Sequence, residues 1–158
     1  MINSEPILNV GIMEQAKKIS GRFRGCFDTK QVKQVSGIFS AENRNNHLNV
    51  ILEGEMINFD TGHVHFKGNE SDTFIIDDVV IGRKFHWERK ENQELCGNLI
   101  LYPDTEGTVT VINQVPLEKY LMSVISSEMS AKAPEELLKA HAITSRSWLV
   151  AMLEKKGN

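Results

Sequence analysis

The chain has 158 residues, of which 41% are hydrophobic and 25% charged, a composition typical of globular proteins and unlike that of disordered or fibrous chains. Its 18 Lys and Arg against 21 Asp and Glu give a formal charge of −3, which disfavours a general nucleic-acid binder. No apolar run approaches the roughly 20 residues of a transmembrane segment, and Glu5 and Pro6 interrupt any signal peptide at the N-terminus.

The first two thirds of the chain predict β-structure. Short apolar or alternating runs, separated by turn-forming residues, are typical of antiparallel strands. They cover residues 7–13, 23–27, 48–52, 63–66, 74–81 and 84–90. Residues 99–102 and 108–112 flank a loop from Pro103 to Gly107, and this arrangement predicts a hairpin.

The pattern changes at Pro116, which suits the start of a helix. Apolar residues then recur at helical spacing as far as Ile125, and residues 126–131 interrupt the pattern. A longer helix is predicted from Pro134 to a stop at Gly157. The sequence therefore predicts an α+β fold, with an antiparallel β-rich N-terminal part followed by two helices.

Histidine and cysteine residues offer a weak case for a metal site. His63 and His65 lie two apart on a predicted strand and face one side, but a third ligand would have to come from elsewhere in the fold. We expect them to be ordinary strand histidines and expect no metal. Cys26 and Cys96 form no metal-binding spacing, and we favour two buried thiols over a disulfide.

Aromatic and basic residues alternate in part between Arg83 and Lys90. Phe85 and Trp87 among Lys and Arg residues could hold a sugar ring or a single nucleic-acid strand. The alternative, which we favour, is an amphipathic strand with a charged outer face.

Glu128 stands at the end of the first predicted helix, after Ser126 and Ser127. A carboxyl at such a position would be partly desolvated, with hydroxyl groups in reach, as suits a general acid. The alternative is a capping or solvated glutamate, and the residues alone favour it.

The segment NQVPLEKYLMSVISSEMSAKAPEELLKAHAITSRSWLVAML resembles the signature of the SpoIID/LytB family, which comprises stage II sporulation protein D and amidase enhancers. The resemblance is ungapped over some forty residues. The matching positions are Asn113, Pro116, Glu118, Tyr120, Leu121, Val124, Ser127, Glu128, Met129, Glu136, Leu138, Lys139, Ala140, Ala142, Arg146 and Ser147. Family members usually carry glutamine where His141 stands.

The resemblance implies a lytic transglycosylase that cleaves peptidoglycan glycan strands stripped of stem peptides and leaves 1,6-anhydro-N-acetylmuramic acid ends. It implies that Glu128, in the S-E-M motif, is the catalytic residue. One carboxyl suffices because the 6-hydroxyl of the sugar replaces the water that a second carboxylate activates in ordinary glycosidases. The alternative is a non-catalytic module that binds peptidoglycan or regulates an amidase.

Five further residues are candidates for supporting roles in this site. Ser126 and Ser127 are expected to orient the carboxyl or bind sugar hydroxyls, with helix capping as the alternative. Glu118, Tyr120 and Arg146 are candidates for a polar network in which Arg146 holds Glu118.

The resemblance also predicts the domain organisation. Residues 1–80 form a β-rich region without an assignment, and residues 81–158 begin a SpoIID/LytB-like catalytic domain that we expect to continue beyond the chain. An active lytic transglycosylase is expected only of the complete domain, with an inactive fragment as the alternative for this chain. No cofactor is expected within the chain, although some relatives bind zinc through Cys and His residues further downstream. The expected partners are peptidoglycan glycan strands and a cell-wall amidase, with no nucleic acid and no transmembrane segment, and the expected location is the cell envelope.

Overall fold

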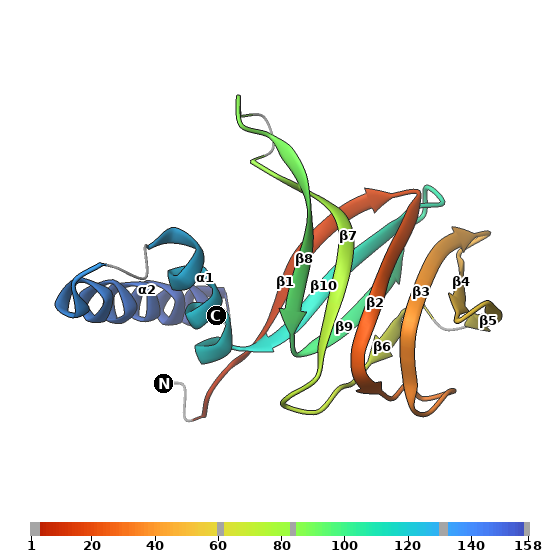
Figure 1. Ribbon diagram of the computed structural model, residues 1–158, viewed down its shortest axis with the longest axis horizontal. Helices are drawn as coiled ribbons and strands as arrows, with labels where there is room; N and C mark the ends of the chain where they lie inside the picture. The colour runs from red at the N-terminus through yellow and green to blue at the C-terminus, as the bar shows by residue number, and fades with distance from the viewer. Residues whose placement is uncertain (1–3, 60–61, 83–84, 130–132, 157–158) are drawn as a thin grey trace. The chain divides into compact units, whose positions relative to one another are not determined.

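A computed structural model describes residues 4–59, 62–82, 85–129 and 133–156 (Figure 1). The chain divides into two compact units: residues 9–114 form the β unit, and residues 1–8 with 115–158 form the helical unit. The strands are β1 Ile7–Ala16, β2 Lys18–Phe27, β3 Val35–Arg44, β4 His47–Leu52, β5 Glu55–Phe59, β6 Val64–Phe66, β7 Thr73–Ile81, β8 Arg89–Cys96, β9 Asn98–Pro103 and β10 Val109–Pro116. The helices are α1 Leu117–Glu128 and α2 Glu135–Lys156.

The strands form two sheets. The larger has the order β5-β4-β3-β2-β7-β8 and is antiparallel throughout. The smaller has the order β1-β10-β9-β6, in which β10 and β6 both run antiparallel to β9. The predicted α+β fold, with antiparallel strands followed by two helices, is confirmed.

Aromatic side chains from both sheets meet in the core of the β unit. The ring centroid of Phe23, on β2, lies 4.7 Å from that of Phe27 and 4.6 Å from that of Phe39. It also lies 5.0 Å from that of Phe66, on β6 in the smaller sheet. Because Phe27, Phe39 and Phe66 are fully buried, their apolar surface holds the two sheets face to face.

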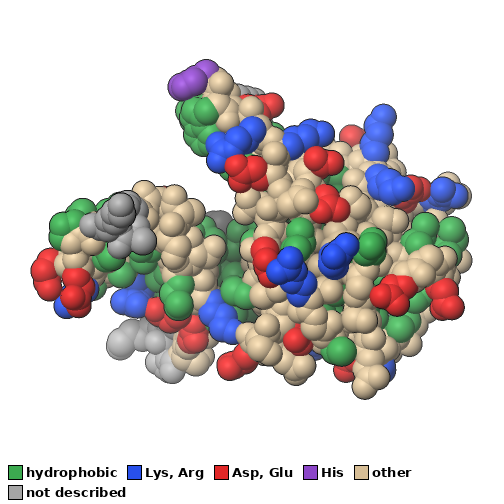
Figure 2. Space-filling model, viewed as in Figure 1, with side chains coloured by type: hydrophobic (Ala, Val, Ile, Leu, Met, Phe, Trp, Pro, Cys, Tyr) green, Lys and Arg blue, Asp and Glu red, His purple; other side chains and the backbone are tan. Residues whose placement is uncertain are grey.

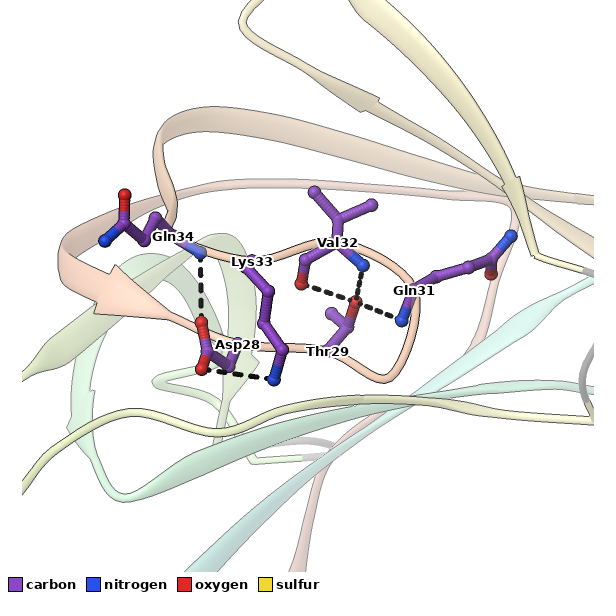
Figure 3. Close-up of polar contacts among 6 residues, drawn as sticks. All are labelled: Asp28, Thr29, Gln31, Val32, Lys33 and Gln34. Atoms are coloured by element: carbon purple, nitrogen blue, oxygen red, sulfur yellow. Dashed lines mark hydrogen bonds and ion pairs between the residues drawn. The ribbon is translucent and has the colours of Figure 1, made fainter.

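The connection between β2 and β3 is held by side chains that satisfy its backbone groups (Figure 3). The Thr29 hydroxyl accepts hydrogen bonds from the amides of Gln31 and Val32, at 3.2 and 2.7 Å, and donates one to the Val32 carbonyl at 2.9 Å. Asp28 accepts a 3.0 Å hydrogen bond from the Gln34 amide, which lowers the pKa of its carboxyl. These contacts fix the turn that brings β3 alongside β2.

β3 and β5 escape prediction, and only the first two residues of β8 lie within the strand predicted at 84–90. β5 and β8 are the two edges of the larger sheet, and the polar sequence of β8 suits an edge that faces water. In β3 the buried positions alternate, with Phe39 and Ala41 in the core, but Gly37 and Asn43 dilute the hydrophobic pattern.

The strand predicted at 84–90 is wrong in its first part. Residues 85–88 form a turn, and β8 begins only at Arg89. Lys84 lies outside the described residues. The amphipathic strand favoured for this segment is therefore replaced by the end of the β7–β8 hairpin.

The boundary between the compact units differs from the one predicted between residues 80 and 81. β7 continues to Ile81, and β8, β9 and β10 complete the two sheets. Residues 81–114 consequently fold with residues 9–80 in one β unit. Backbone pairing therefore unites segments that the sequence motif had separated.

The predicted helix that begins near Pro116 extends three residues past Ile125, to Glu128. The second helix begins at Glu135, directly after Pro134, while its predicted stop at Gly157 lies outside the described residues. Cys26 and Cys96 are both free thiols as predicted, but neither is buried, since Cys26 is exposed and Cys96 is only partly covered.

Candidate active site

Glu128 ends α1, and the backbone turns away at the next residue. The Met129 amide donates a 2.9 Å hydrogen bond to the Ile125 carbonyl, but its own dihedral angles are extended. The Glu128 side chain is 57% exposed, so its carboxyl is more solvated than the sequence led us to expect.

Among the residues that the structure describes, His141 on α2 is the hydrogen-bond partner of Glu128. Its Nε2 atom lies 3.1 Å from Oε2 of Glu128, and the imidazole is only 28% exposed. A neutral imidazole can donate a hydrogen bond to a carboxylate or accept one from a carboxylic acid, according to its tautomer. His141 can therefore hold Glu128 in either protonation state.

Ser126 and Ser127 use their hydroxyl protons within α1. The Ser126 hydroxyl donates to the Met122 carbonyl at 2.7 Å, and the Ser127 hydroxyl donates to the Val124 carbonyl at 2.8 Å. Both side chains are exposed, and their hydroxyl oxygens retain acceptor capacity. Both hydroxyl protons are therefore used inside the helix, which is not a capping contact, and the sugar contact stays a prediction.

Glu118 and Arg146 form the contact that the sequence suggested. Arg146 Nε and Nη2 donate hydrogen bonds to Glu118 Oε1 and Oε2, at 2.7 and 2.5 Å, in a two-point arrangement. The bonded guanidinium lowers the pKa of the Glu118 carboxyl. This pair joins the first turn of α1 to the middle of α2.

Tyr120 does not share this contact. Tyr120 is half-buried. Because it follows Glu118 by two residues on α1, the two side chains leave the helix about 200° apart. The structure therefore brings together Glu118 with Arg146 and Glu128 with His141, in two separate polar contacts between the helices.

Glu5 contacts the first turn of α1, although it lies 113 residues before Glu118 in the sequence. No local sequence pattern predicts this contact. Its Oε1 atom accepts a 2.9 Å hydrogen bond from the Glu118 amide, and the Pro6 carbonyl accepts one from the Leu117 amide at 3.0 Å. Both contacts satisfy amides that the first turn of a helix leaves unpaired. A carboxylate at this end also complements the dipole of α1.

His63 and His65 lie close together in the β unit, as their spacing predicts. The His63 ring stacks on Tyr102, with ring centroids 6.0 Å apart. Burial lowers the pKa of His65, and the positive Lys67 and His63 nearby act in the same direction. Within residues 4–59, 62–82, 85–129 and 133–156, no three His, Cys, Asp or Glu side chains converge as metal ligands.

Neither helix, over the residues that the structure describes, is both long and apolar enough to cross a membrane.

Comparison with known proteins relates the C-terminal third of the chain to one family. Residues 105–158 match the model of SpoIID, described as "Stage II sporulation protein". This match supports membership of that family.

A curated relative adds an independent similarity. An uncharacterized protein of Brachyspira hyodysenteriae is 34% identical over 65 residues, which are 41% of this chain and 17% of that protein. The chain thus covers only about a sixth of the curated relative's length. No solved structure matches the chain.

Proposed function

We propose that this chain, whose residues 105–158 match the SpoIID family model, takes part in lytic transglycosylase cleavage of peptidoglycan glycan strands, with Glu128 as general acid and then base. The observation that carries the proposal is the contact between Glu128 and His141, at 3.1 Å. The His141 imidazole can hold the Glu128 carboxyl both before it donates a proton and after it has become a carboxylate.

The proposed reaction needs no water and no second carboxylate. The Glu128 carboxyl donates its proton to the glycosidic oxygen, and the bond from that oxygen to C1 of N-acetylmuramic acid breaks. The 6-hydroxyl oxygen of the same sugar bonds to C1, and its proton passes to the Glu128 carboxylate. The products are a chain end with a free hydroxyl and a 1,6-anhydro end, and the carboxyl is regenerated.

The surrounding residues have positioning roles in this proposal. His141 accepts a hydrogen bond from the acid form of Glu128 or donates one to the carboxylate. The two-point contact between Arg146 and Glu118 holds α2 to α1, and so keeps His141 within reach of Glu128. Ser126 and Ser127, exposed beside the carboxyl, offer acceptor oxygens to sugar hydroxyls.

The test uses denuded glycan strands incubated with the full-length protein and its Glu128→Gln variant, with products identified by mass spectrometry. We expect anhydro ends from the unmodified protein and a loss of roughly 100-fold or more in the variant, as removal of a general acid and base predicts. Glu106→Gln is the matched control, because Glu106 is an exposed glutamate in the turn between β9 and β10. Equal product from the Glu128 variant would exclude this residue from the mechanism.

A second function has one observation in its favour. The 57% exposure of the Glu128 side chain is high for a carboxyl that must donate a proton, and it suits a non-catalytic module that binds peptidoglycan or regulates a cell-wall amidase. Glycan binding by the unmodified protein, without any anhydro product, would support this module over the enzyme. Either function requires a location in the cell envelope, where peptidoglycan lies.

A further inference from the structure

Trp148 is an aromatic residue of α2 that is 67% exposed, in the same compact unit as Glu128. Thr144 and Ala151, one turn before and one turn after it, are exposed and small, so they leave the indole ring open. The Thr144 hydroxyl donates a 2.9 Å hydrogen bond to the Ala140 carbonyl and keeps acceptor capacity. Figure 2 shows hydrophobic and charged side chains side by side on the surface of the two helices. Such a surface suits a partner with both polar and apolar parts.

Trp148 lies on the side of α2 that carries His141. The two residues are seven positions apart, so their side chains leave the helix about 20° apart and about 10 Å apart along its axis. Because helical side chains lean toward the N-terminus, the indole leans toward His141. His141 in turn contacts Glu128, at 3.1 Å. Trp148 therefore lies in line with the proposed catalytic carboxyl.

Lys155 continues this line in the last turn of α2. It is exposed and follows Trp148 by another seven residues. His141, Trp148 and Lys155 therefore recur at intervals of about 10 Å along one side of the helix, with a drift of about 20° at each step. A β-1,4-linked glycan repeats its disaccharide unit at a similar interval. The spacing thus suits a glycan strand that lies along α2 from Glu128.

We infer that Trp148 and Lys155 form a binding subsite for the glycan strand, an inference that rests on the proposed function and extends its site along α2. The indole stacks on the face of a pyranose ring, where C–H bonds make the sugar apolar. The Lys155 ammonium binds the lactyl carboxylate of N-acetylmuramic acid. That carboxylate is free only where the stem peptide has been removed, so the contact distinguishes stripped strands from strands that carry peptides.

Tryptophan fluorescence tests the stacking directly, because the chain has two tryptophans. Trp87→Phe leaves Trp148 as the single reporter, and Glu128→Gln in the same protein prevents cleavage of the ligand. Peptide-stripped glycan strands should change Trp148 emission saturably and protect it from quenching by acrylamide. Trp148→Phe, which leaves Trp87 as the reporter, should give no response. A response of Trp87 without one of Trp148 would overturn the inference.

Titration calorimetry with the same strands measures the contribution of the indole to affinity. Trp148→Ala should bind about tenfold more weakly, because it loses the stacking surface, while Trp148→Tyr should keep most of the affinity. Ile143→Ala is the matched control, since Ile143 is 60% exposed and lies about 140° around α2 from Trp148. Equal affinity of Trp148→Ala and the unmodified protein would refute the subsite.

Lys155→Met tests the contact with the lactyl carboxylate. This variant should bind stripped strands roughly threefold more weakly, and the difference should disappear at high salt, which screens an exposed ion pair. Its affinity for chito-oligosaccharides, which share the β-1,4 linkage but lack the lactyl group, should be unchanged. Lys30→Met is the control, because Lys30 is an exposed lysine of the β unit. A loss of equal size with chito-oligosaccharides would contradict the carboxylate contact.

The same variants separate this inference from the proposed reaction. Anhydro products from the unmodified protein, together with unchanged affinity in Trp148→Ala, would refute the subsite and leave the reaction in place. Binding that depends on Trp148 but yields no anhydro product would support the subsite and refute the reaction. An unmodified protein that does not bind stripped strands would refute both.

Discussion

Asn113 illustrates how a motif residue acquires its role from the fold. The side chain is buried with 5% exposure, and its Nδ2 atom donates hydrogen bonds to the carbonyls of Cys96 and Asn98, at 2.9 and 3.3 Å. These carbonyls flank the tight turn at Gly97 between β8 and β9, where φ is +93°. The asparagine therefore satisfies backbone groups at a strand connection, and its presence in the family signature has a structural explanation.

His141 makes a contact with Glu128 that the sequence did not reveal. It departs from the usual glutamine of the family, and nothing in its spacing indicates a partner. In the structure it contacts Glu128 across the helix pair. Glu128 and His141 lie 13 residues apart in the sequence and meet because α1 packs against α2. Packing between helices produces no local sequence pattern that would predict the contact.

His65 should make the stability of the β unit depend on pH. Burial lowers the pKa of its imidazole below the ordinary value of 6.5, so the unfolded chain binds more protons than the folded chain as the pH falls through that value. The free energy of unfolding should therefore decrease from about pH 7.5 to about pH 5.5, and His65→Gln should flatten this decrease. Urea unfolding monitored by circular dichroism at the two pH values measures it.

His86→Gln is the control for the pH experiment, because His86 is exposed in the turn between β7 and β8. This variant should keep the pH dependence of the unmodified protein. Carboxyls with lowered pKa, such as Asp28 and Glu118, lose their stabilising effect only at lower pH, near their ordinary values of about 4. The same decrease in the His65 variant would show that this imidazole is not responsible.

The two helices are joined by polar contacts as well as by apolar packing. Leu117 and Leu121 are the buried residues of α1, and Leu149 is buried on α2. Helical periodicity predicts which residues of α1 are apolar, but not which residue of α2 each polar side chain meets. Those pairings depend on the relative rotation and offset of two helices, which only their packing fixes.

A double-mutant cycle should measure the contact between α1 and α2. Glu118→Gln, Arg146→Gln and the double variant should give a coupling free energy of about 0.5–1 kcal/mol in unfolding measurements, since both side chains are nearly half exposed and solvent screens them. Because the pKa of Glu118 is lowered, the stabilisation is present above about pH 4.5 and disappears as the carboxyl becomes protonated.

The same cycle on Glu135 and Lys139, an exposed pair within α2 at 2.9 Å, provides the comparison. We expect a smaller coupling there, because solvent screens an exposed pair four residues apart on one helix. A coupling between Glu118 and Arg146 no larger than that of the intrahelical pair at both low and neutral pH would contradict a specific role in holding the helices together.

At the scale of the molecule, the hydrophobic core cluster of the β unit lies entirely within residues 19–111. Its two sheets include β8, β9 and β10, which the predicted boundary at residue 80 would have separated from the rest. The family match, in contrast, begins at residue 105, within the turn between β9 and β10. The limits of the family model and of the compact units are therefore different.

A fragment of residues 9–114 should fold without the helical unit, because it contains the whole core cluster. Circular dichroism should show β-structure and urea should unfold it cooperatively. Phe23→Ala in this fragment should cost about 3–5 kcal/mol, since the ring packs on Phe27, Phe39 and Phe66. Ile38→Ala is the exposed control. A fragment that stays unfolded where the full chain folds would disprove the independence of the β unit.

The sequence by itself determined that strands precede two helices, that β9 and β10 form a hairpin, and that the residues around Glu128 carry the family resemblance. These depend on local periodicity, turn residues and motif spacing, all of which are local properties of the chain. Only the tertiary structure decided that residues 81–114 complete the sheets, that His141 contacts Glu128 and that Phe85 and Trp87 stack in an exposed turn. These features depend on pairing and packing between segments that are distant in the sequence. The burial and the hydrogen bonds that stabilise them arise only when both segments come together, so neither segment predicts them alone.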